Sequence, residues 1–112
     1  MTDSPGWTAP AFLDSLLPDL RLQMLRMYCD GLRDQSDRLA AMLVDGGSLQ
    51  AATTMVHKIA GAAGMMQDAP LAQAARHLEN RLREAAPDAH MLAQDLLERV
   101  QRTLVSIDDA IG

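Results

Sequence analysis

The sequence of 112 residues contains very few aromatic residues: one Trp, one Tyr and one Phe. It has a single cysteine, Cys29, which excludes an internal disulfide framework and is typical of a reducing compartment. It has no apolar run of roughly 18 residues that could span a membrane. Its first ten residues lack the basic segment and apolar run of a signal peptide. We therefore expect a cytoplasmic protein that does not bind membranes.

Positive charge is also scarce. Ten Lys and Arg residues stand against 15 Asp and Glu residues, which gives a formal net charge of −5, and no basic run occurs. This balance argues against nucleic acid as a partner, because binding a phosphate backbone requires a cluster of cations. The length fits one small domain with a single core.

The residues that are abundant favour helices. Ala, Leu, Met, Arg and Gln are frequent and β-branched residues are few, which predicts an all-α fold. Between two long periodic segments, Gly46 and Gly47 are suited to end one helix and Ser48 to cap the next. Apolar spacing predicts a short helix at about 10–17 and longer helices at about 19–44, 49–66, 71–85 and 89–111.

Four long helices with short connections predict an antiparallel up-down four-helix bundle. The short first helix is expected to lie across one end of it. We assign residues 1–9 to an irregular lead-in and residues 10–112 to the bundle domain.

The helix expected at 49–66 contains two glycines, Gly61 and Gly64, each of which costs about 0.5–1 kcal/mol relative to alanine. At about 100° per residue, both glycines fall on the same face as His57, together with Gln50 and Thr53. The opposite face carries apolar residues, which we predict to be core: Ala52, Met55, Ile59, Ala62, Ala63 and Met66. The spacing therefore predicts an exposed imidazole beside side-chain-free backbone.

An exposed imidazole can act in several ways. A neutral ring nitrogen is a competent nucleophile, and histidine is partly neutral at cellular pH. A metal site would need a second ligand three or four residues away, where Thr53, Thr54, Ala60 and Gly61 stand instead. We find no second titratable group on the face of His57, which argues against an independent acid-base enzyme. The interpretation that remains is a solitary nucleophile that docks with a macromolecule.

The run from Val56 to Gly64, followed by Leu71 and by the pair Leu78 and Glu79, resembles the histidine-containing phosphotransfer (HPt) domain of two-component phosphorelays. The resemblance covers residues of about 49–84. It implies that His57 accepts a phosphoryl group from an aspartyl phosphate and passes it on. The implied partners are the receiver domains of response regulators and a hybrid histidine kinase. The magnesium ion would belong to the partner receiver, with no intrinsic cofactor or metal in this chain.

The resemblance also implies which residues surround the phosphoryl group or dock with the partner. Gly61 would clear space for the receiver, and Glu79 matches the glutamate of the family's Leu-Glu pair. Where the family often has lysine, three residues after the histidine, this sequence has Ala60, so the compensating charge would come from Lys58 or from Arg76, His77 or Arg83. Many members have glycine where Gln67 stands. The whole expected set is Lys58, Ala60, Gly61, Gly64, Met65, Arg76, Glu79 and Arg83.

Other interpretations stay open. The chain could be a helical adaptor that binds receivers or kinases without being phosphorylated, or the phospho-accepting domain of a chemotaxis-type kinase. The two glycines could instead serve close packing between helices, and Arg76, Glu79 and Arg83 could be ordinary surface charges. We expect a free-standing, monomeric relay protein in which Cys29, His77 and His90 are structural or surface residues.

Overall fold

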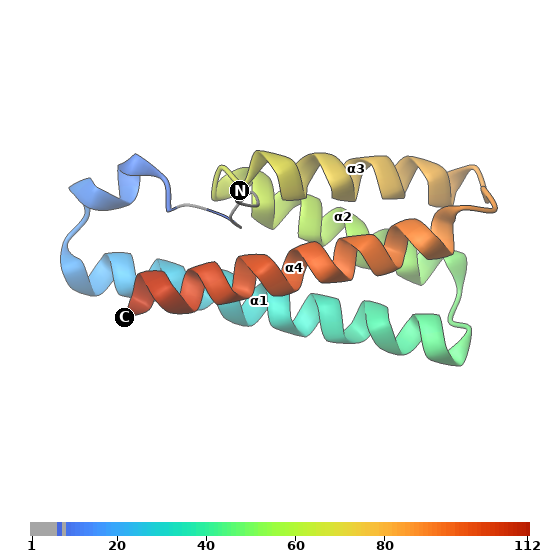
Figure 1. Cartoon of the computed structure of the whole chain (residues 1–112), viewed down its shortest axis with the longest axis horizontal. Helices are drawn as coiled ribbons and strands as arrows, with labels where there is room; N and C mark the ends of the chain where they lie inside the picture. The colour runs from blue at the N-terminus through green and yellow to red at the C-terminus, as the bar shows by residue number, and fades with distance from the viewer. Residues whose placement is uncertain (1–6, 8) are drawn as a thin grey trace, which may run out of the picture.

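The computed structural model describes Trp7 and residues 9–112. Four α-helices run alternately in opposite directions along the long axis of the molecule (Figure 1). They are α1 (Pro18–Asp45), α2 (Leu49–Met65), α3 (Ala69–Arg83) and α4 (Ala89–Ile111), preceded by a short 3₁₀ helix, η1 (Ala11–Ser15). The prediction of an all-α, antiparallel bundle is confirmed.

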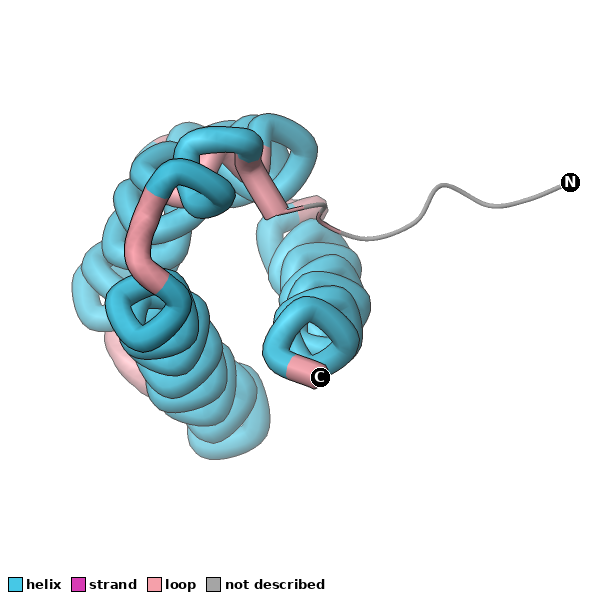
Figure 2. Tube along the Cα trace, turned by 90° about the vertical axis from the view of Figure 1, so that its left-hand side faces the viewer, coloured by secondary structure: helices cyan, strands magenta, loops and turns pink. Residues whose placement is uncertain are grey.

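The bundle closes because each helix packs against its neighbours in the chain and α1 also packs against α4. Figure 2, which looks along the bundle, shows the four helices arranged around a common interior. Leucine, isoleucine, valine and alanine fill most of that interior, together with Trp7 and Tyr28; Leu32, Leu39, Ile59 and Leu78 are fully buried. Helix α1 and helix α4 extend beyond α2 and α3 at one end, where η1 lies (Figure 1).

The helix ends follow the local sequence closely. Gly46 adopts a left-handed conformation (φ 71°) and its N–H donates to the carbonyl of Met42, which ends α1. The Ser48 side chain accepts a hydrogen bond of 3.0 Å from the N–H of Ala51 and caps α2. Helix α3 ends at Arg83, two residues before the predicted end, because Ala85 has a left-handed backbone (φ 52°) that cannot continue a helix.

A buried polar cluster fixes the turn between α2 and α3. The side chain of Asp68 caps α3 by accepting from the N–H of Leu71, and it also accepts hydrogen bonds from the hydroxyls of Tyr28 on α1 (3.3 Å) and Thr103 on α4 (3.0 Å). The indole N–H of Trp7 donates to the carbonyl of Met66 at 2.9 Å. One short turn is thereby tied to α1, to α4 and to the N-terminal segment. Trp7, part of the expected lead-in, is buried, while residues 1–6 and 8 lie outside the described residues.

Gln67, which stands where the resembled pattern has glycine, lies at the centre of this turn. Gln67 has a left-handed backbone (φ 58°), and its N–H donates to the carbonyl of Gly64. The next N–H, that of Asp68, donates to the carbonyl of Ala63 at 2.8 Å. Glycine adopts this conformation without steric cost, which explains why the family pattern has glycine here.

The buried face of α2 is rotated relative to the sequence prediction. We placed its centre opposite His57, but the buried arc is centred about 120° from His57, because it includes Val56 and Ala60. Met55 and Ala62 are only partly buried. The reason is that α2 packs against α3 as well as α1, so burial extends round the helix towards α3. His57 consequently lies at the edge of the α2–α3 contact.

The buried hydroxyl of Tyr28 makes stability sensitive to alkaline pH. Burial, with the nearby charge of Asp68 and the hydrogen bond between them, raises the pKa of Tyr28 above its ordinary value. The unfolded chain therefore loses this proton at about pH 10, below the pH at which the folded chain does, so the stabilisation is complete below pH 10 and declines above it. We expect the free energy of unfolding, measured by urea denaturation, to fall less between pH 9 and pH 11 in Tyr28→Phe than in the wild type. Parallel pH profiles for the two proteins would contradict this assignment.

Candidate functional site

His57 stands on α2 directly across from Glu79 on α3. His57 precedes Asp68 in the α2–α3 turn by eleven residues and Glu79 follows it by eleven, so the antiparallel helices bring the two residues to the same level. The Nδ1 atom of His57 lies 3.1 Å from Oε2 and 3.2 Å from Oε1 of Glu79. The His57 side chain is nevertheless 72% exposed. One edge of the imidazole is held by the protein and the rest faces outward.

This contact determines which ring nitrogen can react. An ionised carboxylate only accepts hydrogen bonds, so Nδ1 carries the proton that it donates to Glu79, whether the ring is neutral or charged. In the neutral ring, the free electron pair must then reside on Nε2. Our prediction that no second titratable group faces His57 is therefore wrong, because the group comes from the neighbouring helix. The arrangement of a carboxylate, an imidazole and a free nitrogen is that of an oriented nucleophile.

Glu79 is not the surface charge or docking residue that the sequence suggested. Its side chain is only 8% exposed, and its Oε2 accepts a hydrogen bond from the guanidinium of Arg83, one turn later on α3. Two positively polarised partners therefore surround the carboxylate, which compensates for its burial. Arg83 itself is 61% exposed.

The two glycines differ in their surroundings. A side chain added at Gly61 would meet no atom within 4 Å, so the backbone one turn after His57 is open. At Gly64 a Cβ atom would lie 3.4 Å from the guanidinium of Arg76, which reaches across from α3. The expectation of bare backbone holds at Gly61, whereas Arg76 partly covers Gly64.

Ala60 has to be removed from the expected docking surface. It is only 4% exposed, because the buried arc of α2 extends to it, so it cannot contact a phosphoryl group or a partner. Lys58 and Met65 are exposed, as expected, and Met65 is 73% exposed. Of the expected set, the structure brings Glu79 and Arg83 to His57 and places Arg76 beside Gly64.

A shallow groove adjoins the site and was not predicted. It has a volume of about 410 Å³ and lies between the start of α2 and the end of α3, where it is lined by Leu49, Gln50, Thr53, Thr54, Leu82 and Arg83. Thr53 and Thr54 precede His57 by about one turn, so the groove continues the surface on which the imidazole stands. Thr53 and Arg83 are equally far from Asp68 along the chain, and so are His57 and Glu79. This symmetry about the turn is the sequence signal that could have predicted that the members of each pair lie opposite each other.

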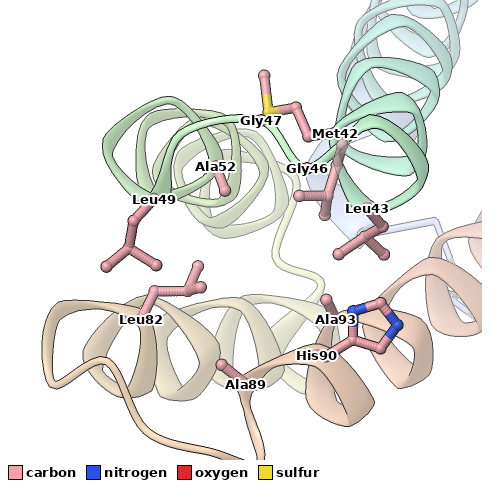
Figure 3. Close-up of a pocket in the computed structure, with 11 residues that line it drawn as sticks. Met42, Leu43, Gly46, Gly47, Leu49, Ala52, Leu82, Ala89, His90 and Ala93 are labelled. Atoms are coloured by element: carbon pink, nitrogen blue, oxygen red, sulfur yellow. The ribbon is translucent and has the colours of Figure 1, made fainter.

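A second hollow lies at the same end of the bundle as this groove, where the α1–α2 and α3–α4 connections meet (Figure 3), and Leu49 and Leu82 line both. Its volume is about 300 Å³, and its lining is mainly apolar, from Leu39 and Leu43 to Ala93. The one titratable side chain in its lining, His90, is exposed and pairs with Gln94 rather than with a carboxylate. This hollow therefore lacks the activated nitrogen found at His57.

A comparison with protein-family models identifies the family. The model of the Hpt domain matches residues 23–106, a segment that includes His57, Glu79 and Arg83. The chain belongs to the Hpt domain family. A search of curated proteins and a search of solved structures found no match to the chain. Hpt domains carry a phosphoryl group in two-component signalling and interact with receiver domains, so phosphotransfer is the activity that the family assigns.

Two further observations describe the rest of this Hpt domain. Across Trp7 and residues 9–112, no group of three His, Cys, Asp or Glu side chains gathers that could hold a metal ion. No helix in the same residues is both long and apolar enough to cross a membrane.

The Glu79 contact predicts the tautomer of the neutral imidazole. In Glu79→Leu, Nδ1 has no acceptor on α3, so we expect the His57 ring to lose its fixed Nδ1–H tautomer. Glu79→Gln keeps an acceptor oxygen but lacks the charge, so the tautomer should persist. Phosphotransfer by this Hpt domain should slow about tenfold, which is the difference between charged and neutral hydrogen bonds. Nitrogen-15 NMR of the ring distinguishes the tautomers. An unchanged ring spectrum in Glu79→Leu would contradict this role.

Proposed function

We propose that His57 accepts a phosphoryl group from the aspartyl phosphate of a receiver domain and passes it to a second receiver. The observation that supports this proposal most directly is the exposed imidazole whose Nδ1 is held by the buried carboxylate of Glu79. A hybrid histidine kinase and a response regulator are the partners that we expect on the two sides of the relay.

The chemistry follows from the tautomer. The electron pair of Nε2 forms the new N–P bond while the P–O bond to the receiver aspartate breaks, and that electron pair leaves with the aspartate carboxylate. The Nδ1 proton stays on the ring, so the imidazole becomes positively charged as the bond forms. The carboxylate of Glu79 stabilises that charge through the hydrogen bond already in place, as the aspartate of a catalytic triad does for its histidine. The reverse sequence returns the phosphoryl group to a receiver.

The charges around His57 suit an anionic partner site. The chain as a whole carries a net charge of −5, yet Lys58, Arg76 and Arg83 are all exposed on the α2–α3 surface near the acceptor. Local positive charge attracts the phosphorylated aspartate of a receiver and shields the transferred group. The exposed Met65 adds an adaptable apolar contact, which is useful for a carrier that must bind more than one partner.

The remaining charge stabilisation is assigned to the partner. Phosphoryl transfer requires cations near the equatorial oxygens, usually including a divalent metal. The carboxylate closest to His57, Glu79, is already engaged by the imidazole and by Arg83. We therefore assign the magnesium ion to the receiver, and to this chain the orientation of the nucleophile.

The first test is the site of labelling. Incubation with a receiver phosphorylated with phosphorus-32 should transfer an acid-labile, base-stable label to the wild-type chain. His57→Gln should abolish it, whereas His77→Gln, which removes another exposed histidine from α3, should leave it unchanged. Labelling that persists in His57→Gln would refute the proposal. Binding of a receiver without any label on wild-type protein would support the adaptor interpretation instead.

The open backbone at Gly61 provides a second test. A glutamine at position 61 has room, so Gly61→Gln should fold and gain about 0.5–1 kcal/mol of stability. Its side chain would stand between His57 and the receiver, so we expect transfer to slow by about tenfold to a hundredfold in a rapid-quench assay. Gly31→Gln on α1 is the matched control, because Gly31 is also helical with no atom near its Cβ position. Equal transfer rates in the two variants would show that the open backbone has no role.

A further inference from the structure

Two arginines at the end of α3 pair with different acidic residues. Arg81 pairs with Glu84 and with Asp88, at the connection between α3 and α4. Among the residues that the structure describes, Arg83 forms an ion pair only with Glu79, the carboxylate that also contacts the imidazole. One cation is therefore bound to the group that orients the nucleophile.

The imidazole and the guanidinium meet at one oxygen of that carboxylate. Oε2 of Glu79 lies 3.1 Å from Nδ1 of His57 and also accepts a hydrogen bond from Nη2 of Arg83. The Glu79 side chain is 8% exposed, so water contributes little to its solvation. These two side chains are therefore the main compensation for its negative charge.

The carboxylate acts on the ring in two ways. It fixes the tautomer, and it also favours the positively charged ring, because opposite charges attract strongly where little water lies between them. The charged ring carries a proton on both nitrogens and has no free electron pair, so it cannot accept a phosphoryl group. A site with only His57 and Glu79 would orient the ring and at the same time favour its unreactive form.

We propose that Arg83 is a positioning residue that acts through Glu79: its guanidinium offsets the carboxylate charge, so that Glu79 orients His57 without holding the ring in its charged form. The inference rests on the proposed function and makes it more specific, because it assigns what keeps Nε2 free. This role needs no contact between Arg83 and a phosphoryl group or a receiver. Only the equilibrium between the neutral and the charged ring is changed.

The other charged groups of α2 and α3 are less well placed for this role. The guanidinium of Arg76 lies over Gly64, about two turns of α2 beyond the histidine. His77 stands two residues before Glu79 and is therefore turned by about 200° from it round α3. Lys58 follows the histidine directly and is turned by about 100° round α2.

The other helix packed against α2 is α1, and its charges do not reach the ring. Asp37 and His57 are equally far from Gly47 along the chain, so Asp34, Asp37 and Arg38 are the charged residues of α1 nearest to the level of the ring. All three are exposed, and Arg38 pairs with Asp34. Across the described part of the chain, no hydrogen bond or ion pair joins α1 to the imidazole or to its carboxylate.

The titration of the ring tests the proposal without any phosphotransfer. Nitrogen-15 NMR from about pH 5 to pH 9 gives the titration midpoint of His57, the pH at which half of the rings are charged. The signals of this ring are those that are missing from His57→Gln. In Arg83→Ala the midpoint should rise by about half a pH unit, as expected for losing one partly exposed charge pair. Arg83→Lys, which keeps the charge, should restore most of the wild-type midpoint, whereas an unchanged midpoint in Arg83→Ala would overturn the proposal.

Two comparisons test whether Arg83 acts through Glu79. Arg76→Ala removes the same charge from the same helix and should move the midpoint less than Arg83→Ala does. Adding Arg83→Ala to Glu79→Gln should have little effect, because the carboxylate charge that Arg83 offsets is already absent. An equal rise in Arg76→Ala, or an undiminished rise in the Glu79→Gln background, would overturn the proposal. Circular dichroism of each variant confirms that the bundle is folded.

The pH dependence of transfer is a second measurement. With the same phosphorylated receiver as donor, the pH at which the transfer rate is half of its alkaline plateau should rise with the midpoint in Arg83→Ala. Below that pH, transfer relative to the plateau should be about threefold slower than in the wild type. A lower plateau with no shift in this pH would indicate that Arg83 only docks the receiver, and would contradict the proposal. Failure of the proposed function is a different result, in which wild-type His57 stays unlabelled while its NMR titration still responds to Arg83→Ala.

Discussion

The site depends on one hydrogen bond across the α2–α3 interface, from Nδ1 of His57 to the carboxylate of Glu79. This bond fixes the tautomer, directs Nε2 outward and places a negative charge beside the ring, where it would stabilise the positive imidazole of the proposed phosphorylation. It forms only if the two helices keep their relative register. The buried cluster of Asp68, Tyr28 and Thr103 holds the turn that sets this register, so the structural polar network supports the functional one.

Burial of the Glu79 carboxylate costs stability, and the residues that it contacts offset this cost. A carboxylate that is 8% exposed would strongly favour unfolding if it were unpaired, but Glu79 accepts from both His57 and Arg83. Because both partners are largely exposed, they remain accessible to a ligand. A more hydrophobic residue at position 79 would make a simpler interface, but it would leave the imidazole without orientation.

Local chemistry made most of the fold predictable. The expected helix at about 19–44 is α1 (Pro18–Asp45), because Gly46 and Ser48 carry unambiguous end signals. The errors occurred where two helices meet. The apolar periodicity of α2 misplaced the centre of its buried arc. Ala60 was expected on the docking surface because it stands where the resembled family often has lysine, but the arc extends to it. In the same way, Glu79 looked like an exposed charge because a helical wheel contains no information about the neighbouring helix.

The sequence by itself determined the class of fold, the boundaries of the helices to within about two residues, and the identity of His57 as the candidate nucleophile. These properties depend on interactions between residues close in the chain, which spacing reports directly. Only the tertiary structure decided that Nε2 is the free nitrogen, that Glu79 is buried beside it, and that Arg83 is the adjacent cation. The reason is that these contacts join two helices, and their geometry depends on the rotation and register with which those helices pack.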